Sequence, residues 1–430
     1  MPRRVFLGAA AALGLAGADE GWVELFDGRS LKGADFRNFE LEIEAMTRPG
    51  ANSGIKFHKG FRIQIGNAER NKTGSLVGLR HIYKQFVPDG QWFTIQAAVR
   101  GKNVQIRLSG MLLVDYTEPV PPLDAQVLSH GVFALENSGG ARFRGVRVRR
   151  LPDDAPTPAG PPPVADEIYR QIIANARRDI PMEDTHVHLK GGLTLEQALA
   201  KSRRDGIQYG IACNLGVHNP VQDDRGALEY LEQLKGKPCY AAMQAEGREW
   251  TQMVSRGVAA QFDYIFTDSM TWTDKRGKRM RLWLPNEVGA IADPQEFMDT
   301  LVDRAVGILE HEPVDIYANP TFLPDVLAAD YEQLWTSARR QKVIQAAVRN
   351  HVAIEINTRY KLPSVSFIRM AKAAGAKFTF GTNNESVKDL DRCEYGLRMV
   401  EECGLGAQDF FVPLSGPKAV ERKGDALRSA

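Results

Sequence analysis

The feature that most constrains the fold is a regular alternation of strand-like and helix-like segments that begins near residue 182. Alternation at this spacing predicts βα units and a parallel sheet. Seven or eight such units close most naturally into a barrel, in which functional sites lie at the carboxyl ends of the strands. The predicted strands are 182–188, 209–215, 239–245, 264–267, 314–318, 353–356 and 377–381, with helices at 194–205, 227–235, 250–257, 294–312, 331–351 and 363–374.

The first predicted strand ends in a His-x-His pair, His186 and His188. Residues i and i+2 of an extended chain point the same way, so both imidazoles can bind one cation. The alternative is a pair of ordinary strand histidines. The later strand ends are also polar, and they carry Asn214, His218, Glu246, Asp268, Asn319, Glu355, Asn357, Asn383, Asn384 and Glu385.

These strand ends predict an open site for one divalent metal ion, which is Zn, Mn or Fe. The predicted ligands are His186, His188, Glu246 and Asp268. Glu385 is a catalytic candidate at the last strand end. A hydrogen-bonded polar pocket without metal is the alternative. Trp rings stack on sugars and Arg groups hold anions. The candidate substrate-binding residues here are therefore Arg248, Trp250, Trp272, Asn319, Asn357, Arg359 and Asn383. The alternative for Arg248, Trp250, Trp272 and Arg359 is plain packing or surface, which is the more frequent role of such residues.

The pattern before residue 150 is that of β-structure throughout. Segments 39–45 and 61–65 alternate apolar and charged residues, and 92–100, 103–108, 112–116, 131–136 and 141–149 follow. Gly-containing turn signals such as Gly101-Lys102-Asn103 separate several of them. Many short antiparallel strands joined by such turns predict a β-sandwich.

The length of 430 residues and the changes in pattern divide the chain. Residues 1–18 combine Arg3-Arg4, a short apolar run and a small-residue site, which predicts a cleaved twin-arginine-type signal. The sandwich then occupies 19–150, a proline-rich linker 151–166, the barrel 167–412 and a tail 413–430. The chain is therefore expected to be periplasmic or secreted, with no stable membrane span.

Charge and cysteine content exclude several classes of protein. The formal net charge is only +2, with 55 basic and 53 acidic residues, so a nucleic-acid surface is not expected. The four cysteines lie far apart without a CxxC pattern. Free, mostly buried thiols are therefore expected rather than disulfides or a zinc cluster.

Several ordered motifs of the first half resemble the 3-keto-disaccharide hydrolase family. They include Pro49-Gly-Ala-Asn-Ser-Gly-Ile55, Gly60-Phe-Arg-Ile-Gln64, Thr73-Gly-Ser-Leu-Val-Gly78 and Leu113-Val-Asp-Tyr116. The resemblance implies a concanavalin-like jelly-roll sandwich and hydrolase or lyase activity on 3-keto-glycosides. Family members usually carry an acidic residue where this chain has Arg62, and often an Asp where it has Asn67.

The polar candidates that remain in this half are Asn52, His58, Arg62 and Gln64. Asn52, Arg62 and Gln64 could hydrogen-bond to sugar hydroxyls, and His58 could act as a base. Together with Glu385, the residues His58, Arg62 and Gln64 are the catalytic candidates. The alternative is that Asn52-Ser53-Gly54 forms a turn and that His58 is solvated.

The order of polar motifs in the second half resembles the polymerase-and-histidinol-phosphatase (PHP) superfamily, a seven-stranded, distorted TIM-like metallohydrolase barrel. His186-Val-His188 and Glu246 match its first and middle motifs. The later motifs differ, because Asn319-Pro320 stands where a His before Pro is usual, and Gly381-Thr-Asn-Asn-Glu385 where Gly-Ser-Asp-x-His is usual. Asn is a poor zinc ligand, so a multinuclear cluster is not expected.

Three functions follow from these features. The first is an exported carbohydrate-active hydrolase or lyase that acts on 3-keto-glycosides, with one divalent metal as a possible aid. The second is a PHP-type metal-dependent phosphoesterase. The third is a non-catalytic sugar-binding protein with a degenerate barrel. The expected partner is a carbohydrate or other small molecule, and the sequence leaves the oligomeric state open.

Overall fold

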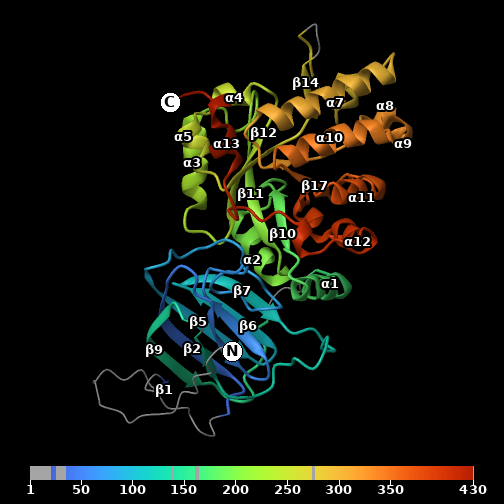
Figure 1. Cartoon of the computed structure of the whole chain (residues 1–430). Coiled ribbons are helices and arrows are strands. Elements are labelled where there is room, and N and C mark those ends of the chain that lie inside the picture. Colours follow the sequence, from blue (N-terminus) through green and yellow to red (C-terminus); the bar gives the residue numbers. More distant parts are fainter. Residues whose placement is uncertain (1–20, 26–34, 138, 160–163, 274–276, 430) are drawn as a thin grey trace. The chain divides into compact units, whose positions relative to one another are not determined.

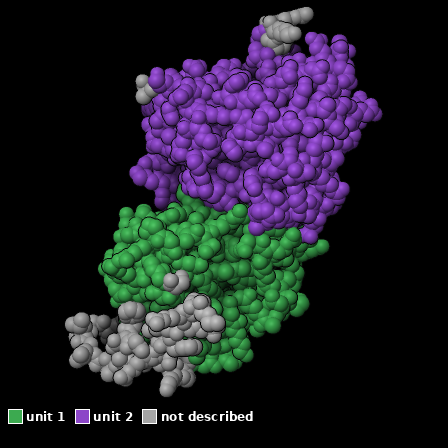
Figure 2. Space-filling view, viewed as in Figure 1, with its two compact units in different colours: residues 1–182, 199–208 green, residues 183–198, 209–430 purple. Residues whose placement is uncertain are grey.

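The computed structural model describes all residues except 1–20, 26–34, 138, 160–163, 274–276 and 430. The predicted signal segment 1–18 lies outside the described residues. The chain forms two compact units, Met1–Met182 with Leu199–Gln208, and Glu183–Ala198 with Tyr209–Ala430 (Figure 2). None of the described helices combines the length and the apolar content that crossing a membrane would need.

The first unit contains a six-stranded sheet in the order β1-β9-β2-β5-β6-β7 and a three-stranded sheet in the order β4-β3-β8. Neighbouring strands within each sheet run antiparallel. These sandwich-like sheets confirm the predicted β architecture of the first half. The strands are β1 (Trp22–Glu24), β2 (Phe39–Thr47), β3 (Ser53–Phe57), β4 (Phe61–Ile65), β5 (Trp92–Arg100), β6 (Asn103–Leu108), β7 (Met111–Thr117), β8 (Ala134–Glu136) and β9 (Ala141–Arg150).

Strand β2 shows why this sequence forms a sheet with one covered face. Its residues alternate between fully buried and half-buried positions along the whole strand. The apolar set that includes Phe39, Leu41 and Ile43 points inward, and Glu40 and Glu42 point outward. Burial of each large apolar side chain contributes about 1.5–3 kcal/mol, so this alternation fixes the register of the strand.

The proline-rich segment packs against the sandwich in its described part. Asn38 Nδ2 donates to the carbonyls of Pro152 (2.8 Å) and Asp153 (3.1 Å). Helix α1 (Asp166–Arg177) follows, and the Tyr169 hydroxyl donates to the Thr117 carbonyl at 2.6 Å. The first unit therefore extends through α1 to Met182.

The second unit is built on a closed barrel of seven parallel strands, as predicted. Helices α3, α10, α11 and α12 lie outside the barrel strands in Figure 1. The barrel strands are β10 (Glu183–Val187), β11 (Gln208–Leu215), β12 (Tyr240–Ala245), β13 (Tyr264–Thr267), β16 (Ile316–Tyr317), β17 (Ala353–Asn357) and β18 (Phe378–Gly381). A hairpin of β14 (Thr271–Thr273) and β15 (Arg279–Arg281) follows β13.

The barrel encloses a core of aromatic, isoleucine and alanine side chains, which includes Tyr240, Tyr264 and Phe266. The four cysteines are free, as predicted. The remaining helices are α2 (Leu195–Asp205), α3 (Asp224–Leu234), α4 (Trp250–Met253), α5 (Arg256–Ala259), α6 (Pro285–Val288), α7 (Pro294–His311), α8 (Asp325–Ala328), α9 (Tyr331–Leu334), α10 (Ser337–Arg349), α11 (Val365–Ala373), α12 (Glu394–Glu402) and α13 (Ala419–Lys423).

Candidate functional site

The register of the three-stranded sheet gathers polar side chains on one face. Gly54 of β3 lies opposite Gln64 of β4 and opposite Glu136 of β8, and Lys56 lies opposite Arg62. Because alternate residues of a strand share a face, Arg62, Gln64 and Glu136 project from the same side. Asn52 precedes β3 directly. Glu136 is thus brought to the site by the pairing of β8 with β3, two strands that are distant in sequence.

The side chains on this face are joined by hydrogen bonds. The Arg62 guanidinium donates to Glu136 Oε2 (3.1 Å), to Asn52 Oδ1 (3.3 Å) and to Gln64 Oε1. Gln64 Nε2 donates to Asn52 Oδ1 at 3.1 Å, and Asn52 Nδ2 donates to Glu69 Oε1 at 3.1 Å. We call these five residues, Asn52, Arg62, Gln64, Glu69 and Glu136, the sandwich cluster.

Gly54 makes this arrangement possible. A Cβ added at Gly54 would lie 2.7 Å from Arg62 Nε and 2.8 Å from the Ile63 carbonyl oxygen. The missing side chain therefore leaves the space through which the Arg62 side chain crosses β3 to reach Glu136. Glycine in a strand often marks such a close approach.

Carboxylates lie beside both positions where the family resemblance implies an acidic residue. Arg62 bonds to Glu136, and Asn67 Nδ2 donates to Asp89 Oδ1 at 2.9 Å. Asp89, Glu69 and Glu136 are not among the site residues predicted from the sequence. The only signal for Glu136 was its place at the end of a predicted strand, since its approach to Arg62 depends on the pairing of β8 with β3.

The charge state of Glu136 follows from its neighbours. Burial alone would raise the pKa of this carboxyl, but hydrogen bonds from Lys56 and Arg62 outweigh burial and lower it. Glu136 is therefore a carboxylate at neutral pH. The cluster presents one carboxylate held by two cations, together with two amides, which is a set of groups suited to sugar hydroxyls.

The structure places His58 in a different environment. Its ring packs against Phe39, Phe57 and Phe61, with centroid distances of 5.6, 5.4 and 6.4 Å. Burial is the main cause that lowers its pKa. None of the hydrogen bonds of the sandwich cluster involves His58. This is the setting of a packed ring, not of a solvated side chain or a base that faces a substrate.

A second polar set lies inside the barrel. His186 of β10 bonds through Nδ1 to Glu355 Oε1 of β17 (2.6 Å) and through Nε2 to Gln244 Oε1 of β12 (3.2 Å). The other Glu355 oxygen accepts from the Asn319 amide N–H (2.7 Å) and from Asn357 Nδ2 (3.0 Å). A Cβ at Gly381 would lie 1.8 Å from Glu355 Oε1, so this glycine is required for the pair.

The hydrogen bonds continue from this pair toward other predicted site residues. Asn319 Nδ2 donates to Asp268 Oδ2 (2.7 Å), and Asn383 Nδ2 donates to Asn319 Oδ1 (3.1 Å). Asn214 Nδ2 donates to Gln244 Oε1 (3.0 Å) and to Glu246 Oε1 (3.3 Å). We call the connected residues the barrel network: Asn214, His186, Gln244, Glu246, Asp268, Asn319, Glu355, Asn357 and Asn383.

The arrangement of these groups does not form a metal site. Among the residues that the structure describes, no group of three or more His, Cys, Asp or Glu side chains is placed to hold a metal ion. Both ring nitrogens of His186 already have protein partners. His188 Nδ1 bonds to the Ala212 carbonyl at 3.0 Å, and its buried Nε2 has no hydrogen-bond partner in the described part of the chain. We therefore derive no chemical step through a metal.

Burial and pairing set the charges in the barrel network. Burial alone would lower the pKa of His186, but the Glu355 carboxylate outweighs it and raises that pKa. The pKa of Glu355 is lowered, because the charge of His186 outweighs its burial. Burial, with the nearby Asp268, raises the pKa of Glu246 to about 7. The side chains of His186 and Glu355 meet at 2.6 Å, and both pKa shifts favour a buried ion pair between them.

These charge states predict different titrations for the two histidines. His186 should keep its proton above pH 6.5, its ordinary pKa. His188 should stay neutral well below that pH, because burial and the positive His186 both lower its pKa. Side-chain nitrogen NMR shifts across pH 5–8 measure both directly. A neutral His186 at pH 6.5 would show that the ion pair does not form.

The flanking candidates differ in their contacts, and two of them donate to backbone carbonyls of the barrel network. Trp250 is fully buried, and its indole N–H donates to Glu312 Oε2 at 2.7 Å. Arg248 also bonds to Glu312, at 2.6 Å, and donates to the Asp268 carbonyl of the barrel network at 3.1 Å. The Trp272 ring stacks on Phe297 at 4.9 Å. Arg359 pairs with the half-exposed Glu385, which also binds Lys190, and Arg359 Nη1 donates to the Asn383 carbonyl of the barrel network at 3.4 Å.

The comparisons with known proteins bear on the first unit. The fold and the contacts define the class of this unit: it is a β-sandwich protein with a polar cluster on one sheet. Residues 32–149 match the family model of the 3-keto-alpha-glucoside-1,2-lyase-like domain. The chain therefore carries a 3-keto-disaccharide hydrolase-like domain at its N-terminal side. No curated protein matches the chain.

Solved structures similar to the chain include two proteins of Parabacteroides distasonis ATCC 8503, assigned by inference as glycosyl hydrolases. One is 19% identical, with 27% of this chain and 80% of that chain covered and a TM-score of 0.24. The other is 15% identical, with 35% and 88% covered and a TM-score of 0.25. A carbohydrate-binding module, CBM66 of Bacillus subtilis, is 14% identical, with 27% and 74% covered and a TM-score of 0.17.

Proposed function

We propose that this protein is a carbohydrate-active hydrolase or lyase, and that its sandwich cluster binds and cleaves 3-keto-glycosides. The observation that carries the proposal is the coincidence of the matched family domain, residues 32–149, with the sandwich cluster. Arg62 and Gln64 lie on β4 of that domain. Glu136 lies on β8, and it comes close to them because β3 pairs with both β4 and β8.

The chemistry needs a base and hydrogen-bond donors, but no serine or cysteine nucleophile. In a 3-keto-glycoside the ketone at C3 acidifies the proton on C2. A carboxylate takes that proton, the electron pair forms the C1–C2 double bond, and the C1 substituent leaves with a proton from water or an acid. Water added at C1 would complete a hydrolysis. Glu136 and Glu69 are the carboxylates of the cluster, and Arg62 supplies positive charge for the enolate.

The test is a comparison of three substrates with the full-length chain. We expect cleavage of an aryl 3-keto-glucoside, and far slower cleavage of the same glucoside without the ketone and of an aryl phosphate. Rapid aryl phosphate cleavage would support the phosphoesterase alternative instead. Binding of the keto-sugar without turnover would leave a sugar-binding protein.

The barrel network does not favour the phosphoesterase alternative. The resemblance to the PHP superfamily implies several ligands that converge on metal ions, and the described residues contain no such group. The resemblance to that superfamily and the single metal ion therefore stay predictions. Export by the predicted signal is part of the proposal, and it is tested by locating the full-length chain in cell fractions.

A further inference from the structure

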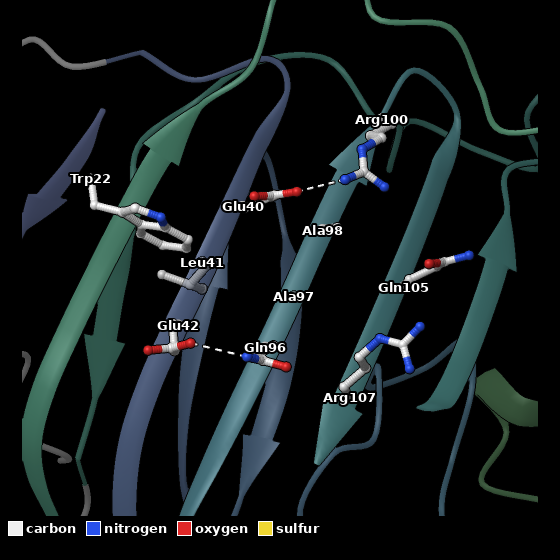
Figure 3. A pocket seen from close by; sticks show the side chains of 10 residues that line it. All are labelled: Trp22, Glu40, Leu41, Glu42, Gln96, Ala97, Ala98, Arg100, Gln105 and Arg107. Atoms are coloured by element: carbon white, nitrogen blue, oxygen red, sulfur yellow. Dashed lines mark hydrogen bonds and ion pairs between the residues drawn. The ribbon is translucent and has the colours of Figure 1, made fainter. Parts of the chain in front are cut away.

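The outward face of the six-stranded sheet carries a hollow that is separate from the sandwich cluster. One cross-strand row runs through it, from Trp22 on β1 to Arg149, Glu40, Ala98 and Gln105. The next row places Arg147, Glu42, Gln96 and Arg107 beside it. The hollow has a volume of about 310 Å³ and is lined by Trp22, Glu40, Leu41, Glu42, Gln96, Ala97, Ala98, Arg100, Gln105 and Arg107 (Figure 3).

The sequence explains why the sheet is hollowed here. Ala98 points outward between Glu40 and Gln105, its two cross-strand partners, which carry long side chains. The side chain of Ala98 is a single methyl group, so the hollow is shallowest in side-chain atoms at Ala98 and is bordered by the longer side chains of Glu40 and Gln105. The volume is at the lower end of the range of ~300–1,000 Å³ that small-molecule pockets occupy.

One arginine of the hollow, Arg107, has no carboxylate partner among the described residues, whereas the others are paired. Glu40 is paired with Arg100 at 2.5 Å and with Arg149, and Glu42 is paired with Arg147 at 2.6 Å. Arg107 is exposed and donates to the Gly110 carbonyl at 3.4 Å. Within the described ranges, no carboxylate lies at ion-pair distance from Arg107. An anionic ligand would therefore find a free guanidinium here.

The remaining walls suit a sugar. Gln96 Nε2 donates to Glu42 (3.0 Å) and Gln105 Nε2 donates to Asp115 (3.4 Å), which leaves one N–H and the oxygen of each amide to bond to hydroxyl groups. Trp22 closes the opposite end with an aromatic ring, over which the Arg147 and Arg149 guanidinium groups lie at 4.9 and 5.2 Å. Aromatic rings with polar neighbours are the usual surroundings of a bound sugar ring.

We propose that this hollow is a second saccharide site, which binds a glycan that contains uronic acid. A uronate carboxylate pairs with Arg107 in the two-pronged geometry that guanidinium and carboxylate share. Its hydroxyls bond to Gln96 and Gln105, and the chain runs toward Trp22. This site rests on the proposed function only for the class of ligand, a saccharide. It would hold one part of a polymer while the sandwich cluster acts on another part.

The test is calorimetric titration of the full-length chain with a galacturonic acid trisaccharide and with the neutral galactose trisaccharide of the same linkage. We expect the acidic sugar to bind at least 10-fold more tightly. Arg107→Gln should weaken acidic binding at least 10-fold, and Ala98→Leu, which fills the floor, should weaken both sugars. Arg142→Gln is the matched control, since Arg142 is exposed on the same sheet but does not line the hollow.

Other results would overturn the site. Equal affinity for both sugars, no binding of either, or unchanged affinity in Arg107→Gln would each do so. If Arg62→Met lost binding of the acidic sugar and Arg107→Gln did not, the sugar would be assigned to the sandwich cluster instead. Cleavage of 3-keto-glycosides should be unchanged in Ala98→Leu, so failure of this site and failure of the proposed function are separable.

Discussion

A Glu355→Gln substitution is expected to lower the unfolding free energy of the barrel by about 3–5 kcal/mol, the usual cost of breaking a buried ion pair. Glu355 and His186 are almost completely buried, and their side chains meet at 2.6 Å. The variant leaves the positive His186 without its counter-charge. It also weakens the acceptor for the Asn319 and Asn357 N–H groups.

Denaturant-dependent hydrogen exchange of the peptides that contain β10 and β17 measures this loss within the barrel unit. Glu310→Gln is the matched control, because Glu310 pairs with Arg349 at the surface, where the two side chains are 36% and 58% exposed. Such surface pairs contribute about 0–1 kcal/mol. Equal protection in both variants would contradict the ion pair.

The same pair predicts a pH window for barrel stability. Glu355 has a lowered pKa, so its contribution is present above its ordinary value of 4.5 and is lost as pH falls through the folded value. His186 has a raised pKa, so its contribution is present below 6.5 and is lost as pH rises through the folded value. The pair therefore contributes fully between about pH 4.5 and 6.5.

A Gly54→Ala substitution is the second change with a large expected effect. The added methyl group would overlap both the Arg62 guanidinium and the Ile63 carbonyl, so the side chain of Arg62 or the strand must move. Overpacking of this kind costs about 1–3 kcal/mol. The displaced Arg62 would also lose its bonds to Glu136 and Asn52, so affinity for a 3-keto-glycoside should fall at least 10-fold.

Thermal unfolding and sugar titration of the same preparation measure both effects. Gly145→Ala is the control, because Gly145 stands on β9 of the same unit and an added Cβ there meets nothing within 4 Å. If Gly54→Ala bound the keto-sugar as wild type does, the crossing of Arg62 over β3 would have no part in recognition.

Much of the fold could be predicted, because the spacing of apolar residues along the sequence indicates where strands and helices lie. All seven barrel strands fall within two residues of their predicted bounds, and three sandwich strands, β4, β5 and β6, match fully. Strand β3 was missed. Asn52-Ser53-Gly54 carries turn-forming residues, yet pairing with β4 on one side and β8 on the other holds Ser53–Phe57 extended.

The sites were harder to predict than the fold, because registers and side-chain directions decide them. The positions of His186, Asp268 and Asn319 at the ends of β10, β13 and β16 could be predicted, because parallel strands of a barrel end together. Their role in a site stays a prediction. It gave no means to see that Glu355 would occupy a ring nitrogen of His186, or that Glu136 and Asp89 would lie beside Arg62 and Asn67. These contacts join residues 22 to 169 positions apart.

The central claim is that the sandwich cluster, not the barrel network, acts on the sugar. The most direct test is kcat/KM for an aryl 3-keto-glucoside in Arg62→Met and in Glu246→Gln. We predict that Arg62→Met lowers kcat/KM at least 10-fold, and that Glu246→Gln stays within about twofold of wild type, the scale of ~0.4 kcal/mol in transition-state binding. A large loss in Glu246→Gln with Arg62→Met unaffected would contradict the claim and place the chemistry in the barrel.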